Sequence, residues 1–347
     1  MTYDPLVRFL SQRSARYQRR ARLRILGSGE LTDAAVSIYQ ELGGQILRYT
    51  ATPTLFSLAS LVFVFAYVLP TFLVTNHPES IGAQIGESAF TIGVALAVCA
   101  PLLAIGIGFS SAFVVGLVSD YMNGQIARPL DHLAKARKLL PRIVGLGIWQ
   151  TLCASVGVLL GLGLLMASAV IGSSSTDDSV IATLVAALAT IGVIFGSLAF
   201  PIVLARQILI LPIVVIEGLG IRAAARRNRE LMRANAIHPS GYSHATTIVF
   251  LVVFLVLFIW LGVASVFAIV DPEQILGAWL KGNVAHDLVI AAVRYVPLYV
   301  TLWTVIPVWC AAAALLYYER RTRLEGYDIE ALAEDLGKHV KKNRFEL

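Results

Sequence analysis

Long apolar stretches alternate with shorter polar ones along this 347-residue chain. A helix needs about 20 apolar residues to cross the roughly 30 Å hydrocarbon core of a bilayer. Six stretches reach that length and predict six transmembrane helices, at residues 52–74, 90–118, 143–171, 180–204, 246–270 and 288–318. The pattern therefore predicts an all-α, polytopic membrane protein in which residues 51–318 form a six-helix bundle.

Amphipathic stretches lie beside these spans and predict helices on the membrane surface. One covers residues 31–48, and two shorter basic ones cover 126–140 and 218–236. After the sixth span, Gly326 predicts a helix stop and Asp328 predicts the cap of a last helix within 319–347. The apolar faces of the first and last helices consist of Leu31, Ala35, Ile38, Leu42 and Ile46, and of Ile329, Leu332, Leu336 and Val340.

The basic residues are sorted between alternate sides of the predicted spans. Residues 1–50 hold eight of the 28 Lys and Arg, 119–142 hold five, 206–244 hold six and 319–347 hold seven. The loops 75–88, 172–179 and 271–287 contain only Lys281, and Arg294 lies near the outer end of the sixth span. Because Lys and Arg are retained in the cytoplasm, both termini are predicted inside. We expect a multi-pass protein of the bacterial inner membrane.

Composition excludes a water-soluble domain, because 57% of the residues are hydrophobic, only 14% are charged and the mean hydropathy is +0.74. Soluble domains carry about 25% charged residues. We interpret the net charge of +6 as Lys and Arg retained on the cytoplasmic side of the membrane, so nucleic-acid binding is not expected. We interpret the N-terminal arginines as a topology anchor on anionic lipid, and we expect the first span, without a signal peptide, to direct insertion. The N-terminal arginines are Arg13, Arg16, Arg19, Arg20, Arg22 and Arg24.

Small residues recur every four positions within three of the spans. This spacing lets helix backbones approach closely, which is how helices associate in lipid. We expect packing within the chain, with a homodimer interface as the alternative. The residues are Gly108, Ala112 and Gly116 in the second span, Gly157 and Gly161 in the third, and Gly192 and Gly196 in the fourth.

Two charged residues flank the end of the fourth span. Arg206 lies between Pro201 and Pro212, and Glu217 follows eleven residues later. In one interpretation the two prolines break a helix, and Arg206 and Glu217 line a polar path. In the other, 205–217 is an interfacial elbow, where Arg206 meets lipid phosphate and Glu217 pairs with a nearby arginine. We favour the elbow because 180–204 already suffices to cross.

The residue inventory gives little support to catalysis. No predicted span has a central Asp, Glu, Lys or His, which disfavours an ion-coupled carrier. The six histidines are scattered, and the three cysteines lie in apolar runs, so neither a metal nor another cofactor is expected. Phosphate-binding P-loops and the Gly-x-Ser-x-Gly elbow of hydrolases are absent from the sequence. We expect a non-enzyme.

Two segments carry a resemblance to a known family: 206–233, RQILILPIVVIEGLGIRAAARRNRELMR, and 315–330, LLYYERRTRLEGYDIE. They resemble the membrane domain that precedes the catalytic part of some bacterial glycerophosphodiester phosphodiesterases and that also occurs alone in six-span proteins; 31–47 and 124–139 fit more loosely. The catalytic barrel and its His-Arg-Gly motif are missing, so the resemblance implies topology and not activity. It points to Arg206, Pro212, Glu217, Gly218, Arg227, Tyr318, Arg321, Glu325, Gly326 and Asp328.

These observations predict a scaffold or accessory subunit of a membrane complex, which docks protein partners or anionic lipids through its basic cytoplasmic elbows. The alternative is a permease or lipid-handling transporter with a cavity near Arg206 and Glu217. A membrane or cytoplasmic protein and anionic lipid headgroups are the expected partners. The predicted contact residues are Arg206, Glu217, Arg222, Arg226, Arg227, Arg229, Arg233, Tyr318, Arg321, Glu325 and Asp328.

Overall fold

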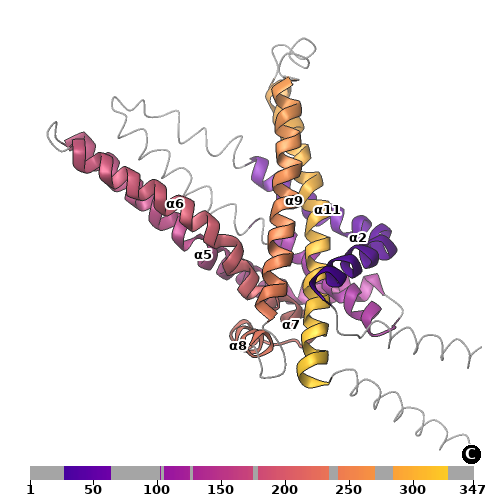
Figure 1. The fold of residues 1–347 in the computed structure, drawn as a ribbon. Helices are drawn as coiled ribbons and strands as arrows, with labels where there is room; N and C mark the ends of the chain where they lie inside the picture. Colours follow the sequence, from indigo (N-terminus) through magenta and orange to yellow (C-terminus); the bar gives the residue numbers. More distant parts are fainter. Residues whose placement is uncertain are drawn as a thin grey trace, which may run out of the picture.

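A computed structural model describes residues 27–63, 102, 105–125, 128–174, 179–233, 241–269 and 284–326. Every regular element in these ranges is a helix, so the predicted all-α class is confirmed for the described part of the chain. The helices are α2 (Ser28–Phe63), an unlabelled helix at Ile105–Met122, α5 (Pro129–Ser174), α6 (Ser179–Gln207), α7 (Ile210–Ile216), α8 (Ile221–Met232), α9 (Gly241–Ile269) and α11 (Val284–Glu325), shown in Figure 1.

Three helical segments are long and apolar enough to cross a membrane: Ile105–Met122, Gly241–Val263 and Tyr299–Glu325. They overlap the second, fifth and sixth predicted spans; the fifth begins earlier than predicted, at Gly241, and the second and sixth end later, at Met122 and Glu325. The third and fourth predicted spans lie in α5 and α6, which are 46 and 29 residues long. Most of the second half of the first predicted span lies outside the described residues. The structure is that of a helical protein compatible with a membrane.

Two predicted surface helices continue directly into spans. The helix predicted at 31–48 and the first span form one helix, α2, which runs through Pro53. The stretch 126–140 and the third span likewise share α5, which runs through Pro141. In α2, the carbonyls of Leu47 and Ala51 accept hydrogen bonds from Trp303 Nε1 (3.0 Å) and the Tyr299 hydroxyl (3.3 Å) of α11. These contacts hold α2 against α11 in the two turns before Pro53, and the helix continues beyond the proline.

The elbow after the fourth span is buried. α6 ends at Gln207, two turn residues follow, and α7 then runs from Ile210 to Ile216. Five of the seven α7 residues are buried, so other parts of the chain cover most of this apolar helix. The chain therefore breaks at Ile208 and Leu209, whereas Pro201 and Pro212 lie inside α6 and α7, and most of residues 208–215 are buried. Gly218, with φ of +71°, reverses the chain before α8.

The buried core occupies one end of the molecule, which we call the base. It is formed by the first half of α2, the end of the 105–122 helix, the start of α5, α7, α8, the first turns of α9 and the last turns of α11. We call the remaining parts of α5, α6 and α9 the arms, because these helices extend away from the base in Figure 1. Their exposed residues include Leu160, Phe195 and Phe254, between 66% and 69% exposed. The structure thus joins a packed base to helices with apolar surfaces.

Glycines mark where helices approach most closely. A Cβ on Gly108 would lie 2.6 Å from Ile143 Cγ2, and one on Gly116 would lie 2.5 Å from His132 Nδ1. In the arms, the Cβ position of Gly192 is 3.4 Å from the Gly161 Cα. The tightest approach involves Gly106, where a Cβ would collide with the carbonyl oxygen of Pro53 in α2. Gly106 was not among the predicted packing residues.

Candidate functional site

α8 is a basic amphipathic helix whose two faces have opposite surroundings. Its buried side chains are Ala224, Asn228, Leu231 and Met232. Its exposed face carries Arg222, Arg226 and Arg229, and exposed Arg233 follows at its C-cap, so the spacings are four, three and four residues. Positions i, i+4, i+7 and i+11 share one side of an α-helix, so the four arginines form a single stripe. We call this stripe the outer face of α8.

Arg227 points to the other side, where it meets carboxylates. It forms ion pairs with Glu325 at the end of α11, with Glu217 at the end of α7 (Nε to Oε1, 3.6 Å) and with Glu230 one turn along α8 (3.7 Å). Burial lowers the pKa of Arg227, but the negative charges of Glu325 and Glu217 outweigh it, so that its pKa is raised. Arg227 is therefore a fully paired cation.

The same carboxylates are shared with α11. The Tyr317 hydroxyl donates a hydrogen bond to Glu217 Oε1 at 2.7 Å. Arg321 lies one turn further on and donates from Nε to Glu325 Oε2 at 3.0 Å. These five residues form a network that joins α7, α8 and α11 at the base, although almost 100 residues separate α11 from the other two helices in sequence. The expectation that Glu217 pairs with a nearby arginine is confirmed.

Arg320 fixes the end of α8. It is completely buried, and its Nε and Nη2 donate to the carbonyls of Leu231 (2.8 Å) and Arg233 (3.2 Å). The last carbonyls of a helix lack partners within the helix, and a cation there also opposes the negative end of the helix dipole. Arg320 thus stabilises the C-terminal end of α8. Sequence reasoning missed it, because nothing local distinguishes it from Arg321 and Arg323.

Two further polar contacts hold the 105–122 helix in the base. Tyr318 is buried, and its hydroxyl lies 2.8 Å from Ser119 Oγ and accepts from Asn123 Nδ2 at 3.2 Å. Asp120 Oδ2 lies 2.7 Å from His132 Nε2 at the start of α5. Tyr318, predicted as a partner or lipid contact, therefore contacts another helix of this chain. The Asp120–His132 pair was not foreseen from the sequence.

Three residues that the sequence analysis singled out remain: Arg206, Gly326 and Asp328. Arg206 is exposed at the end of α6, and its carbonyl accepts a hydrogen bond from Asn228 Nδ2 of α8 at 2.7 Å. Gly326, with φ of +62°, ends α11 as predicted. Asp328 and the helix predicted to follow it lie outside the described residues.

Within the described ranges, no group of three or more His, Cys, Asp or Glu is arranged to hold a metal ion.

No protein-family model matches this chain, and neither the curated proteins nor the solved structures give a match. The resemblance to the phosphodiesterase membrane domain therefore stays a prediction, which rests on the two sequence segments that carry it.

Proposed function

We propose that this chain is a non-catalytic, six-span scaffold or accessory subunit of the bacterial inner membrane, with both termini in the cytoplasm. The outer face of α8 is its docking surface for anionic groups of a partner. One observation carries the proposal: on a single short helix, Arg227 is paired with three carboxylates, whereas the four outer arginines are exposed.

The outer face is electrostatically unfavourable by itself. Like charges at i, i+4 on a helix destabilise it by about 0.2–0.5 kcal/mol per pair. Arg222 and Arg226 have this spacing, as do Arg229 and Arg233. Among the described residues, none of the four outer arginines forms an ion pair with a carboxylate. An external anion relieves this repulsion, and arginine offers it planar, bidentate hydrogen bonding.

The base also presents α8 rigidly. Arg320 holds the last carbonyls of α8, Asn228 ties its middle to the end of α6, and Arg227 anchors its inner face. A binding surface on a helix held at three points loses little conformational freedom when it binds. This arrangement suits a docking surface better than a flexible basic loop would.

The transporter alternative finds less support. Glu217 is bound to Tyr317 and Arg227, and Arg206 is exposed at the end of α6 rather than beside Glu217 in a described cavity. The groove that the structure describes lies instead on α9. Glu217→Gln tests the alternative directly, since a polar path that uses this carboxylate would lose uptake in the variant. Unchanged flux removes the transporter reading.

Copurification tests docking. The tagged chain is purified in mild detergent, and co-eluting proteins are quantified by mass spectrometry for wild type and two variants. One variant carries Gln at positions 222, 226, 229 and 233, and its matched control carries Lys at the same four positions. We expect the Gln variant to lose a co-eluting protein at least tenfold, while the Lys control retains part of it. The same proteins in equal amounts from wild type and the Gln variant contradict the proposal.

Cysteine labelling tests topology. Single cysteines are placed at Ser11 and Ser175 in a chain whose Cys99, Cys153 and Cys310 are replaced by alanine. A membrane-impermeant maleimide added to spheroplasts is expected to label position 175 directly and position 11 only after permeabilisation. Labelling with the opposite sidedness contradicts the six-span arrangement.

A further inference from the structure

We infer that the first turns of α9 bind one anionic phospholipid of the cytoplasmic leaflet, with its phosphate at Arg233 and an acyl chain along α9. This inference rests on the proposed membrane placement of the chain but not on docking by the rest of α8. Four observations carry it: a groove, its polarity gradient, the chemistry of its hydroxyl groups and its position near an exposed arginine whose backbone is held in place.

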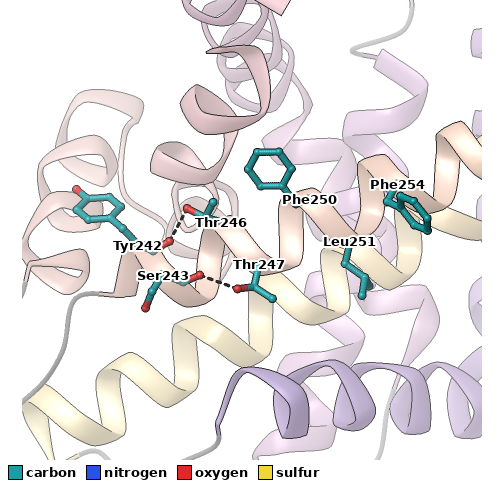
Figure 2. Close-up of a pocket in the computed structure, with 7 residues that line it drawn as sticks. All are labelled: Tyr242, Ser243, Thr246, Thr247, Phe250, Leu251 and Phe254. Atoms are coloured by element: carbon teal, nitrogen blue, oxygen red, sulfur yellow. Dashed lines mark hydrogen bonds between the residues drawn. The ribbon is translucent and has the colours of Figure 1, made fainter. Parts of the chain in front are cut away.

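The groove is a shallow, open one of about 750 Å³ along one side of α9. Figure 2 shows two rows of side chains that line it, with hydroxyl-bearing residues at one end and apolar residues at the other. From first to last lining residue, twelve helical steps of about 1.5 Å give a length of roughly 18 Å. The lining consists of Tyr242, Ser243, Thr246, Thr247, Phe250, Leu251 and Phe254.

The polarity of the groove follows the depth profile of one bilayer leaflet. All four lining residues in the first seven positions of α9 carry hydroxyl groups, and the three that follow are apolar. Half of the hydrocarbon core is about 15 Å thick, so the groove is long enough to reach from the headgroup region deep into one leaflet. A lipid molecule has this same gradient. A protein helix would instead require small residues for close approach, whereas Phe250 and Phe254 project from this face and are 46% and 69% exposed.

The two threonines present hydrogen-bond acceptors. The Thr246 hydroxyl donates to the carbonyl of Tyr242 at 2.7 Å, and the Thr247 hydroxyl donates to that of Ser243 at 3.0 Å. Each hydroxyl has one proton, so once that proton is used the oxygen offers only lone pairs. A headgroup with O–H donors complements these oxygens, whereas the trimethylated ammonium of choline does not. A glycerol headgroup therefore fits better than a choline headgroup.

The backbone of an exposed arginine, Arg233, is held near the polar end of the groove. The Cβ position of Gly241 is 2.8 Å from Met232 Sδ, which places the end of α8 against the start of α9. Arg233 follows Met232 and is exposed, while Arg320 holds its backbone carbonyl at 3.2 Å. A guanidinium carried on this backbone, near hydroxyl acceptors, matches a phosphate ester that carries a glycerol headgroup. The resulting ligand class is phosphatidylglycerol.

Native mass spectrometry tests the inference on the full chain, purified in mild detergent and stripped of lipid. Phosphatidylglycerol and phosphatidylcholine with identical acyl chains are titrated, and bound lipids are counted. We expect one phosphatidylglycerol to bind about tenfold more tightly than phosphatidylcholine. Both lipids have the phosphate, but only phosphatidylglycerol has a net negative charge for Arg233 and O–H donors for the threonines. Arg233→Gln and the isosteric pair Thr246→Val with Thr247→Val are each expected to reduce this preference to about twofold or less.

Matched controls separate a site from general attraction. Arg222→Gln removes the same charge at the far end of α8, and Thr304→Val removes a threonine of α11 whose hydroxyl is bonded in the same way to the Val300 carbonyl. Both controls are expected to keep the wild-type preference. Equal binding of the two lipids, or an equal loss in Arg222→Gln and Arg233→Gln, overturns the inference in favour of non-specific annular lipid.

The outcomes also distinguish this inference from the proposed function. If the wild-type chain binds both lipids equally but copurifies a protein, the α9 site is contradicted and the scaffold proposal stands. If the wild-type chain prefers phosphatidylglycerol but no protein co-elutes, the docking role is contradicted and the lipid site stands. Unchanged unfolding midpoints of the variants verify that each measurement reports binding.

Discussion

The base and the arms differ in what surrounds their side chains: other helices of the chain bury those of the base, whereas many apolar side chains of the arms are exposed. In the base, Tyr317, Tyr318, Glu319 and Arg320 are at most 2% exposed, and named hydrogen bonds or ion pairs link each of them to other groups. In the arms, side chains such as Leu160, Phe195 and Phe254 remain mostly exposed. Lipid is as apolar as these side chains, so helices in a bilayer gain little by hiding them from it.

This difference indicates where the stability and the specificity of the molecule lie. A buried polar group costs about 1–3 kcal/mol when its partner is removed, whereas an exposed residue away from such contacts changes stability by no more than about 0.5 kcal/mol. Substitutions in the base should therefore have large effects on folding, and those on exposed surfaces should mainly affect binding. Three predictions follow this order, all measured by unfolding in mixed micelles titrated with sodium dodecyl sulfate.

Arg320→Met should have the largest effect, a loss of about 3 kcal/mol. The apolar side chain keeps much of the volume but leaves the carbonyls of Leu231 and Arg233 without this donor, and it removes a buried charge beside Glu319. Arg222→Gln, which removes an exposed arginine at the start of α8, serves as the control and should be nearly neutral. Equal midpoints for both variants would show that the base does not depend on its buried guanidinium.

Gly106→Ala should cost roughly 2 kcal/mol, because the added methyl group collides with the backbone of α2 and forces two helices apart. Gly262→Ala is the matched control, since a Cβ there meets no heavy atom within 4 Å. In a helix interior, alanine is favoured over glycine by about 1 kcal/mol. The two substitutions should therefore have opposite signs, and a neutral or stabilising Gly106→Ala contradicts the close approach.

Neutralising the outer face of α8 should have the smallest effect on folding. Replacement of all four arginines by glutamine removes like-charge repulsion without touching the network around Arg227, so the change should stay within about 0.5 kcal/mol. The same variant should lose its docking. A destabilisation above about 2 kcal/mol would mean that the outer face belongs to the folded base and is not a free surface.

Several features of the fold could be predicted from short stretches of sequence. Apolar runs long enough to cross a membrane predicted the all-helical class, Gly326 marked the end of α11, and the basic amphipathic stretch 218–236 predicted the helix α8. Each of these depends on helical periodicity or on one residue's backbone preference, which act over a few residues. The surface helices predicted at 31–48 and 126–140 are continuous with the segments that follow them, because α2 runs on through Pro53 and α5 through Pro141.

Only the tertiary structure decided how neighbouring charges divide between partners. Arg226 and Arg227 are adjacent, yet one is exposed and the other joins Glu217 and Glu325; Arg320 and Arg321 likewise have separate partners. Local sequence gives these pairs identical chemistry. Their roles differ because neighbouring residues on a helix point about 100° apart, and the surroundings each one meets are set by helices about 100 residues away in the chain.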